Sequence, residues 1–228
     1  ITLASSLHFT STDAFKNKVE SLIDSQDNVY SIGSLSLDNL RYFVPLDKTI
    51  LCEKFAFPNE EFALVTFHPE TVETRLNYRY ADSMLNALLK ISEFINIVIT
   101  MPNADTLGSI YRSEIIKLKK KVPNKVFLIE NFGKANYFSA MYYSSILIGN
   151  TSSGIIEAAS FGKYVVNVGD RQKGRLQSKN ILNAQFNYND LILKVNQALK
   201  LGDYEGDNVY LKKNVVNNFI EILKKKKL

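Results

Sequence analysis

Short apolar runs alternate with longer amphipathic segments along most of the chain. The apolar runs predict strands, at 7–10, 29–33, 62–67, 95–101, 126–130, 145–149 and 164–168. The amphipathic segments predict helices, at 13–23, 74–94, 108–121, 135–143, 154–161, 188–199 and 208–226. Such alternation indicates an α/β fold in which helices cover both faces of a doubly wound parallel sheet. From Phe62 onward the runs are continuously apolar, as is typical of strands buried on both faces.

A domain boundary is expected between residues 39 and 61. This stretch contains Pro45 and Pro58, mixes polar with apolar residues and has no clear period. The residues before it are predicted to hold two strands and two helices, too few for a stable sheet of their own. They are expected to pack on the larger unit or on sequence that precedes them. The sequence thus predicts an incomplete first unit at 1–45 and a larger domain at 46–228.

Composition narrows the classes of function. With 228 residues and 46% apolar residues, the chain can bury a sizeable core. Its net charge of +5 owes much to lysines 224–227, and the other basic residues are mixed with acidic ones, which argues against nucleic-acid binding. The sequence contains neither the roughly 18 consecutive apolar residues of a membrane span nor an opening secretory signal. A single cysteine, Cys52, fits a reducing compartment, so a cytoplasmic location is expected.

The strongest chemical signal is the loop that follows the predicted strand at 145–149. It carries Ser152, Ser153 and Gly154 into a predicted helix, where amides, hydroxyls and the helix dipole favour an anion. An ordinary helix cap explains the same residues, because the spacing of a P-loop is missing. Glu157, one turn further on, either accepts the hydroxyls of a ribose or complements the helix dipole.

Polar residues also follow two other predicted strands. Arg171 and Arg175 lie after the strand at 164–168 and suit a diphosphate, although a surface ion pair is the usual role of a single arginine. His68 follows the strand at 62–67 and is placed to contact a phosphate or to protonate a leaving oxygen. A loop or capping histidine is the alternative reading.

A nucleobase is the candidate ligand of Asn131 and Phe132, which follow the strand at 126–130, although simple packing is the more common role of such a phenylalanine. Asn103 follows another strand and is equally consistent with an N-cap turn. Because ligands of parallel sheets bind outside the carboxyl ends of the strands, all these residues are expected at one edge of the sheet. The sequence has no cysteine–histidine cluster for zinc, no nucleophile elbow and no dinucleotide-binding fingerprint.

Four of these motifs together resemble the hydrolysing UDP-N-acetylglucosamine 2-epimerases, most of all the branch of sialic-acid and related nonulosonate biosynthesis. The motifs are Phe-His-Pro at 67–69, Pro-Asn-Ala-Asp at 102–105, the segment 149–157, and Gly-Asp-Arg-Gln-Lys-Gly-Arg at 169–175. Residues 1–9 and 33–39 resemble the middle region of the same family. The similarity covers nearly the whole chain.

The resemblance implies two Rossmann-like domains of the GT-B type, with this chain supplying the tail of the first and all of the second. The second domain would bind UDP and UDP-N-acetylglucosamine without a metal or another cofactor. Ser152, Ser153 and Gly154 would contact the diphosphate, and Glu157 the ribose. Asn131 and Phe132 would contact the uracil, and His68 would lie near the leaving oxygen. Arg171 and Arg175 would belong to the wall of the site.

The implied reaction eliminates UDP to give a 2-acetamidoglucal and then adds water to release N-acetylmannosamine. The parent enzyme is expected to be a homodimer or a tetramer. The family's proline after the Ile-Ile-Glu-Ala motif is Ala159 here, and the carboxylates of the first domain are not in this sequence. The chain alone is therefore expected to be inactive. A GT-B glycosyltransferase that uses a UDP-sugar and a non-catalytic UDP-sugar-binding module are the alternatives.

Overall fold

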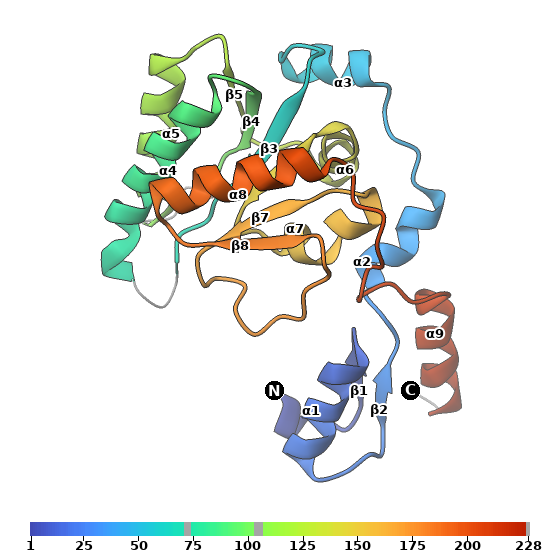
Figure 1. The fold of residues 1–228 in the computed structure, drawn as a ribbon. Helices are drawn as coiled ribbons and strands as arrows, with labels where there is room; N and C mark the ends of the chain where they lie inside the picture. The colour runs from blue at the N-terminus through green and yellow to red at the C-terminus, as the bar shows by residue number, and fades with distance from the viewer. Residues whose placement is uncertain (71–73, 103–106, 227–228) are drawn as a thin grey trace. The chain divides into compact units, whose positions relative to one another are not determined.

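The computed structural model describes residues 1–70, 74–102 and 107–226 and divides into two compact units. The first unit contains Ile1–Val44 and Asn208–Leu228, and the second contains Pro45–Asp207. The ribbon in Figure 1 shows the strands of the second unit beside one another with helices against them.

The second unit is built on a six-stranded sheet in the order β5-β4-β3-β6-β7-β8, and every neighbouring pair is parallel. The strands are β3 (Phe62–Thr66), β4 (Asn96–Thr100), β5 (Val126–Ile129), β6 (Ile146–Gly149), β7 (Val165–Val168) and β8 (Ile181–Ala184). The predicted parallel sheet is confirmed, and each predicted strand from residue 62 onward corresponds to one of β3 to β7.

Helices cover both faces of this sheet because its central strands are apolar on both sides. All five residues of β3 are buried. Val65 faces a cluster that includes Leu88, Ile115 and Leu191, whereas Leu64 faces another cluster that includes Leu51 and Met141. The helices of the second unit are α3 (Lys48–Phe55), α4 (Asn77–Ile91), α5 (Gly108–Lys121), α6 (Lys134–Tyr143), α7 (Ser152–Ile156) and α8 (Tyr188–Leu201), with 3-10 turns at Thr74–Leu76 and Ala158–Phe161.

Two elements of the second unit were not predicted. Helix α3 lies in the stretch that has no clear period, and it buries only Leu51 and Cys52. Its start is fixed by Asp47, whose carboxylate accepts the N–H groups of Thr49 and Ile50 at 2.8 and 3.2 Å. Strand β8 is at the edge of the sheet and is only partly buried, so its sequence lacks the continuous apolar run of the central strands.

The first unit has a two-stranded parallel sheet of β1 (His8–Thr10) and β2 (Val29–Ser31). Its helices are α1 (Asp13–Ile23), α2 (Leu35–Asp38) and α9 (Val215–Lys225), with 3-10 turns at Thr2–Ala4 and Asn39–Tyr42. The rings of Phe9 and Phe219 lie 4.5 Å apart and join β1 to α9. Both predicted strands and the predicted helix at 13–23 are present.

The C-terminal segment differs from its prediction in two respects. The helix expected at 208–226 begins at Val215, because Asn208 accepts the N–H of Tyr210 in a local turn and Asn214 adopts a left-handed conformation. The segment also packs with the N-terminal residues, where Asp38 accepts the N–H of Val215 at 2.9 Å. The predicted domain at 46–228 differs from the observed division in this last segment.

Candidate functional site

Three loops at the carboxyl ends of β3, β6 and β7 form a polar pocket of about 300 Å³. We call it the arginine pocket, and it is lined by His68, Thr151, Ser152, Arg171, Gln172 and Arg175. Four of the residues singled out in the sequence, His68, Ser152, Arg171 and Arg175, therefore share one pocket. The rule that ligands bind beyond the carboxyl ends of parallel strands anticipates this arrangement.

A second pocket, of about 360 Å³, is also lined by a residue of the first turn of α7, Ser153. We call it the glutamate pocket, and it is lined by Thr100, Asn131, Phe132, Gly133, Lys134, Tyr137, Phe138, Ser153 and Glu157. The two pockets are neighbours because Ser152 lines the first and the next residue, Ser153, lines the second. Eight of the ten candidate residues thus lie in two adjoining pockets.

Of the other two candidates, Gly154 lines neither pocket. Gly154 is buried, and a Cβ atom there would lie 3.0 Å from a methyl group of Val165, so its absence allows close packing between α7 and β7. Gly154 can reach a ligand only through its backbone. Asn103 lies outside the described residues.

The loop before α7 differs in detail from the expectation. Thr151 is the N-cap residue, and its hydroxyl accepts the N–H of Ser153 at 3.3 Å. Ser152 and Ser153 are in the first turn, and α7 ends after five residues at Glu157. A full helix dipole is therefore not available, and the donors are the hydroxyls and amides of a single turn.

The aromatic wall of the glutamate pocket has two members of different character. Phe132 is 3% exposed and its ring packs 4.5 Å from that of Phe55, so most of its surface serves the core. Tyr137, which was not among the candidates predicted from the sequence, lines the same pocket and is partly buried. Burial, with the nearby charge of Glu157, raises the pKa of Tyr137 to about 12, so its hydroxyl keeps its proton near neutral pH.

The loop that carries the two arginines is fastened to the loop after β3. Glu70 accepts the backbone N–H of Arg171 at 3.1 Å, and the Arg171 guanidinium donates to the carbonyl of Pro69 at 2.7 Å. Within the described residues, neither Arg171 nor Arg175 forms an ion pair with a carboxylate. Their positive charge is therefore available to an anion in the arginine pocket.

Glu70 is a buried carboxyl that sequence reasoning did not single out. It is 6% exposed, and burial raises its pKa although Arg171 and Asn150 act in the opposite direction. Its backbone N–H and carbonyl are both paired with the side chain of Asn77, at 2.9 and 3.0 Å. Proximity to the Phe-His-Pro motif was the only sequence signal for it.

The raised pKa of Glu70 predicts a pH-dependent effect on stability. The contribution of the Glu70 carboxyl to the free energy of unfolding is fully present below the ordinary pKa of glutamate, about 4.3. It is lost as the pH rises through the raised pKa of this group in the folded state. Glu70→Gln, which keeps an acceptor for Arg171, should be more stable than the wild type near neutral pH, with the gap closing towards about pH 4. Urea unfolding across this range measures the effect, with the exposed Glu205→Gln as control. Parallel curves for wild type and Glu70→Gln would contradict it.

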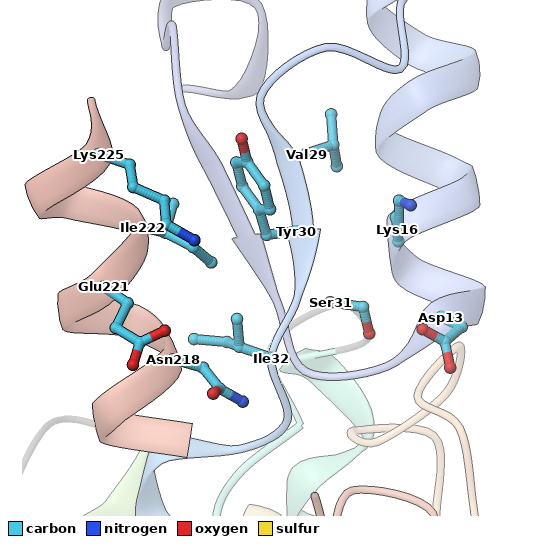
Figure 2. A pocket seen from close by; sticks show the side chains of 10 residues that line it. All are labelled: Asp13, Lys16, Val29, Tyr30, Ser31, Ile32, Asn218, Glu221, Ile222 and Lys225. Carbon is cyan, nitrogen blue, oxygen red and sulfur yellow. The ribbon is translucent and has the colours of Figure 1, made fainter. Parts of the chain in front are cut away.

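A third pocket, of about 340 Å³, lies in the first unit between α1, β2 and α9. Figure 2 shows Asp13 and Lys16 on one side and Glu221 and Lys225 on the other, with Ile32 between them. None of the residues singled out in the sequence lines it. In the described ranges there is no cluster of three or more His, Cys, Asp or Glu residues that could hold a metal ion. None of the helices described is long and apolar enough to cross a membrane.

The sheet and its polar edge define the second unit as a Rossmann-like α/β domain, and similar solved structures are epimerases and glycosyltransferases of the GT-B type. The predicted fold class is confirmed. The chain belongs to the UDP-N-acetylglucosamine 2-epimerase family, whose profile matches residues 1–224.

Named relatives agree with this membership. The chain is 29% identical over 228 residues to the polysialic acid biosynthesis protein P7 of Escherichia coli, covering 98% of this chain and 58% of that protein. It is 31% identical over 188 residues to a hydrolysing GDP/UDP-N,N'-diacetylbacillosamine 2-epimerase of Campylobacter jejuni, covering 82% and 49%. The chain thus spans roughly half of the length of these relatives.

Among solved structures, a UDP-N-acetylglucosamine 2-epimerase of Neisseria meningitidis bound to its sugar nucleotide gives a TM-score of 0.78. The identity is 21%, and the match covers 98% of this chain and 62% of that one. At this identity the match establishes the fold, and the family membership comes from the sequence.

Proposed function

We propose that this chain is the UDP-binding half of a hydrolysing UDP-N-acetylglucosamine 2-epimerase. The observation that carries the proposal is the meeting of His68, Ser152, Arg171 and Arg175 in one pocket beside the pocket of Glu157. The family and its hydrolysing relatives support it. The activity of the whole protein is part of the proposal.

In this proposal the diphosphate occupies the arginine pocket. Two guanidinium groups and the Thr151 and Ser152 hydroxyls provide donors there, and donors of this kind bind phosphate oxygens strongly. When the bond between the sugar and UDP breaks, negative charge collects on the departing diphosphate. Donors that are already in place stabilise that charge more in the transition state than in the bound substrate, and this difference accelerates the step. His68 supplies a further donor to the leaving oxygen.

The nucleoside occupies the glutamate pocket. Glu157 is 7% exposed, and its carboxylate is an acceptor that suits the two hydroxyls of a ribose. Tyr137, Phe132 and Asn131 supply an aromatic wall and an amide for the base. Proton abstraction from the sugar and the addition of water are left to carboxylates of the parent enzyme's first domain.

Calorimetric titration with UDP tests this assignment. The wild-type chain is expected to bind UDP, and Glu157→Ala and His68→Ala are each expected to weaken binding about tenfold, because each loses a hydrogen bond that involves a charged group. Glu114→Ala, on α5 and outside both pockets, is the control and should bind as the wild type does. Unchanged affinity in both site variants would overturn the assigned pockets.

A glycosyltransferase that uses a UDP-sugar is the second candidate, because glycosyltransferases share this fold. The intact parent enzyme incubated with UDP-N-acetylglucosamine alone distinguishes the two. Release of N-acetylmannosamine and UDP supports the epimerase, whereas a requirement for an acceptor molecule supports the transferase.

A further inference from the structure

Asn150 follows β6 directly and is fully buried, and its side chain forms hydrogen bonds with both the backbone N–H and the backbone carbonyl of His68. Its Oδ1 accepts the N–H of His68 at 2.7 Å, and its Nδ2 donates to the carbonyl of the same residue at 2.8 Å. Both backbone groups of one residue are thus paired with a single side chain 82 positions away in the sequence. This pairing constrains where the chain around His68 can lie.

The pairing continues the sheet beyond the point where the backbone of β6 leaves it. The regular register between β3 and β6 ends at Thr66 and Gly149, and the N–H of Asn150 still donates to the carbonyl of Thr66 at 3.2 Å. The backbone then turns into the loop before α7. The Asn150 amide replaces the next residue of the strand as partner of His68, because it offers the same donor and acceptor as a peptide group.

Asn150 also contacts the loop that carries the arginines. Gln172 is 5% exposed, and its Nε2 donates to the carbonyl of Asn150 at 2.8 Å. One buried residue therefore connects the loop of His68, the loop of Thr151 and Ser152, and the loop of Arg171 and Arg175. These are the three loops that line the arginine pocket.

We propose that Asn150 is a positioning residue that fixes the three loops so that their donors converge on the diphosphate. The inference rests on the proposed function for the identity of the ligand. Asparagine suits the role because the bonds to His68 need one donor and one acceptor on a side chain of this length, and aspartate lacks the donor. Without the amide, the backbone N–H and carbonyl of His68, which lie in a partly buried position, lose the bonds to Asn150, and the loop is free to shift.

Binding of UDP and of uridine to wild type and Asn150→Ala tests the proposal. The dissociation constant of uridine divided by that of UDP measures what the diphosphate contributes to affinity. We expect Asn150→Ala to reduce this ratio about tenfold or more through weaker UDP binding, because misplaced donors lose charge-assisted hydrogen bonds. The affinity for uridine should stay within about twofold of the wild type, because the glutamate pocket keeps its lining residues. An equal loss of both affinities, or no loss, would overturn the role.

Asn180→Ala is a matched control for lost stability. Asn180 is also fully buried, its Nδ2 donates to the carbonyl of Lys163 at 2.8 Å, and it lines neither pocket. It should leave the ratio unchanged even where it lowers the unfolding temperature. If Asn150→Ala does not fold, Asn150→Ser carries the same test, because its hydroxyl and a water molecule can partly satisfy His68.

Hydrogen exchange at the backbone N–H of His68 tests the positioning without any ligand. In the wild type this N–H should be protected, and in Asn150→Ala or Asn150→Ser it should exchange faster while the N–H groups within β4 keep their protection. Unchanged protection of His68 would contradict the proposal. If the wild-type chain binds UDP no more tightly than uridine, the assignment of the diphosphate to the arginine pocket fails. The hydrogen-exchange result still tests the positioning role of Asn150.

Discussion

Gly149→Ala is expected to destabilise the second unit by about 4 kcal/mol or more, because a Cβ atom collides with the backbone of the neighbouring strand. That atom would lie 1.8 Å from the carbonyl oxygen of Thr66, and Gly149 has a φ of +143°, which side chains rarely adopt. A flexible side chain could move aside, but the Thr66 carbonyl belongs to the central strand β3. Urea unfolding followed by circular dichroism measures the loss of stability.

Gly202→Ala separates backbone strain from collision. Gly202 has a φ of +72° at the end of α8, and a Cβ atom there meets no heavy atom within 4 Å. With a ψ of −137° this backbone lies outside the left-handed helical region, and the substitution should cost about 2 kcal/mol, the penalty for a side chain held in a conformation that glycine alone adopts readily. If Gly149→Ala costs no more than Gly202→Ala, the close approach of β3 and β6 at Gly149 is not what requires glycine there.

The central strands could be predicted because strands that are buried on both faces consist of continuous runs of apolar residues. Residues 62–66 are all apolar or threonine, and each is buried in the sheet. Helix α4 is similar, since Ala81, Met84, Leu88 and Ile91 recur at helical spacing and are all buried. Where a segment buries one clear face, periodicity is a sufficient guide.

The elements that were missed or misplaced lack such a face. Helix α3 depends on the Asp47 cap and two buried residues, and β8 is partly exposed. The start of α9 is set by Asn208 and Asn214, whose effect on the backbone is local and does not show in a hydrophobic pattern. Here capping and turn chemistry carried the information that periodicity did not.

The candidate site shows the same division. The rule that ligands bind beyond the carboxyl ends of parallel strands predicted that His68, Ser152, Arg171 and Glu157 lie at one edge of the sheet. In the structure these four residues line two adjoining pockets. The residues that hold this edge together, Asn150, Glu70 and Gln172, act through pairings across 82, 101 and 22 positions. Pairings of this kind depend on the three-dimensional arrangement of loops, so a single sequence does not reveal them.

The double variant Arg171→Ala, Arg175→Ala is expected to weaken UDP binding about a hundredfold or more, because it removes both guanidinium groups that the proposed function assigns to charge-assisted hydrogen bonds with the diphosphate. Arg171 already donates one N–H to Pro69, and its other N–H groups remain for phosphate oxygens. The affinity of the wild type should fall as salt is added, and that of the double variant should depend less on salt. Calorimetric titrations at several salt concentrations measure both effects.

Arg112→Ala is the matched control for the loss of an arginine. Like Arg171, Arg112 donates to a proline carbonyl, that of Pro102 at 2.9 Å, but its charge is paired with Glu130 at 2.6 Å and it lines neither pocket. Its removal should leave the affinity for UDP unchanged. Arg171→Lys should fall between wild type and Arg171→Ala, because an ammonium keeps the charge and loses the planar fork that matches a phosphate. Equal affinities for wild type and the double variant would show that the diphosphate does not occupy the arginine pocket.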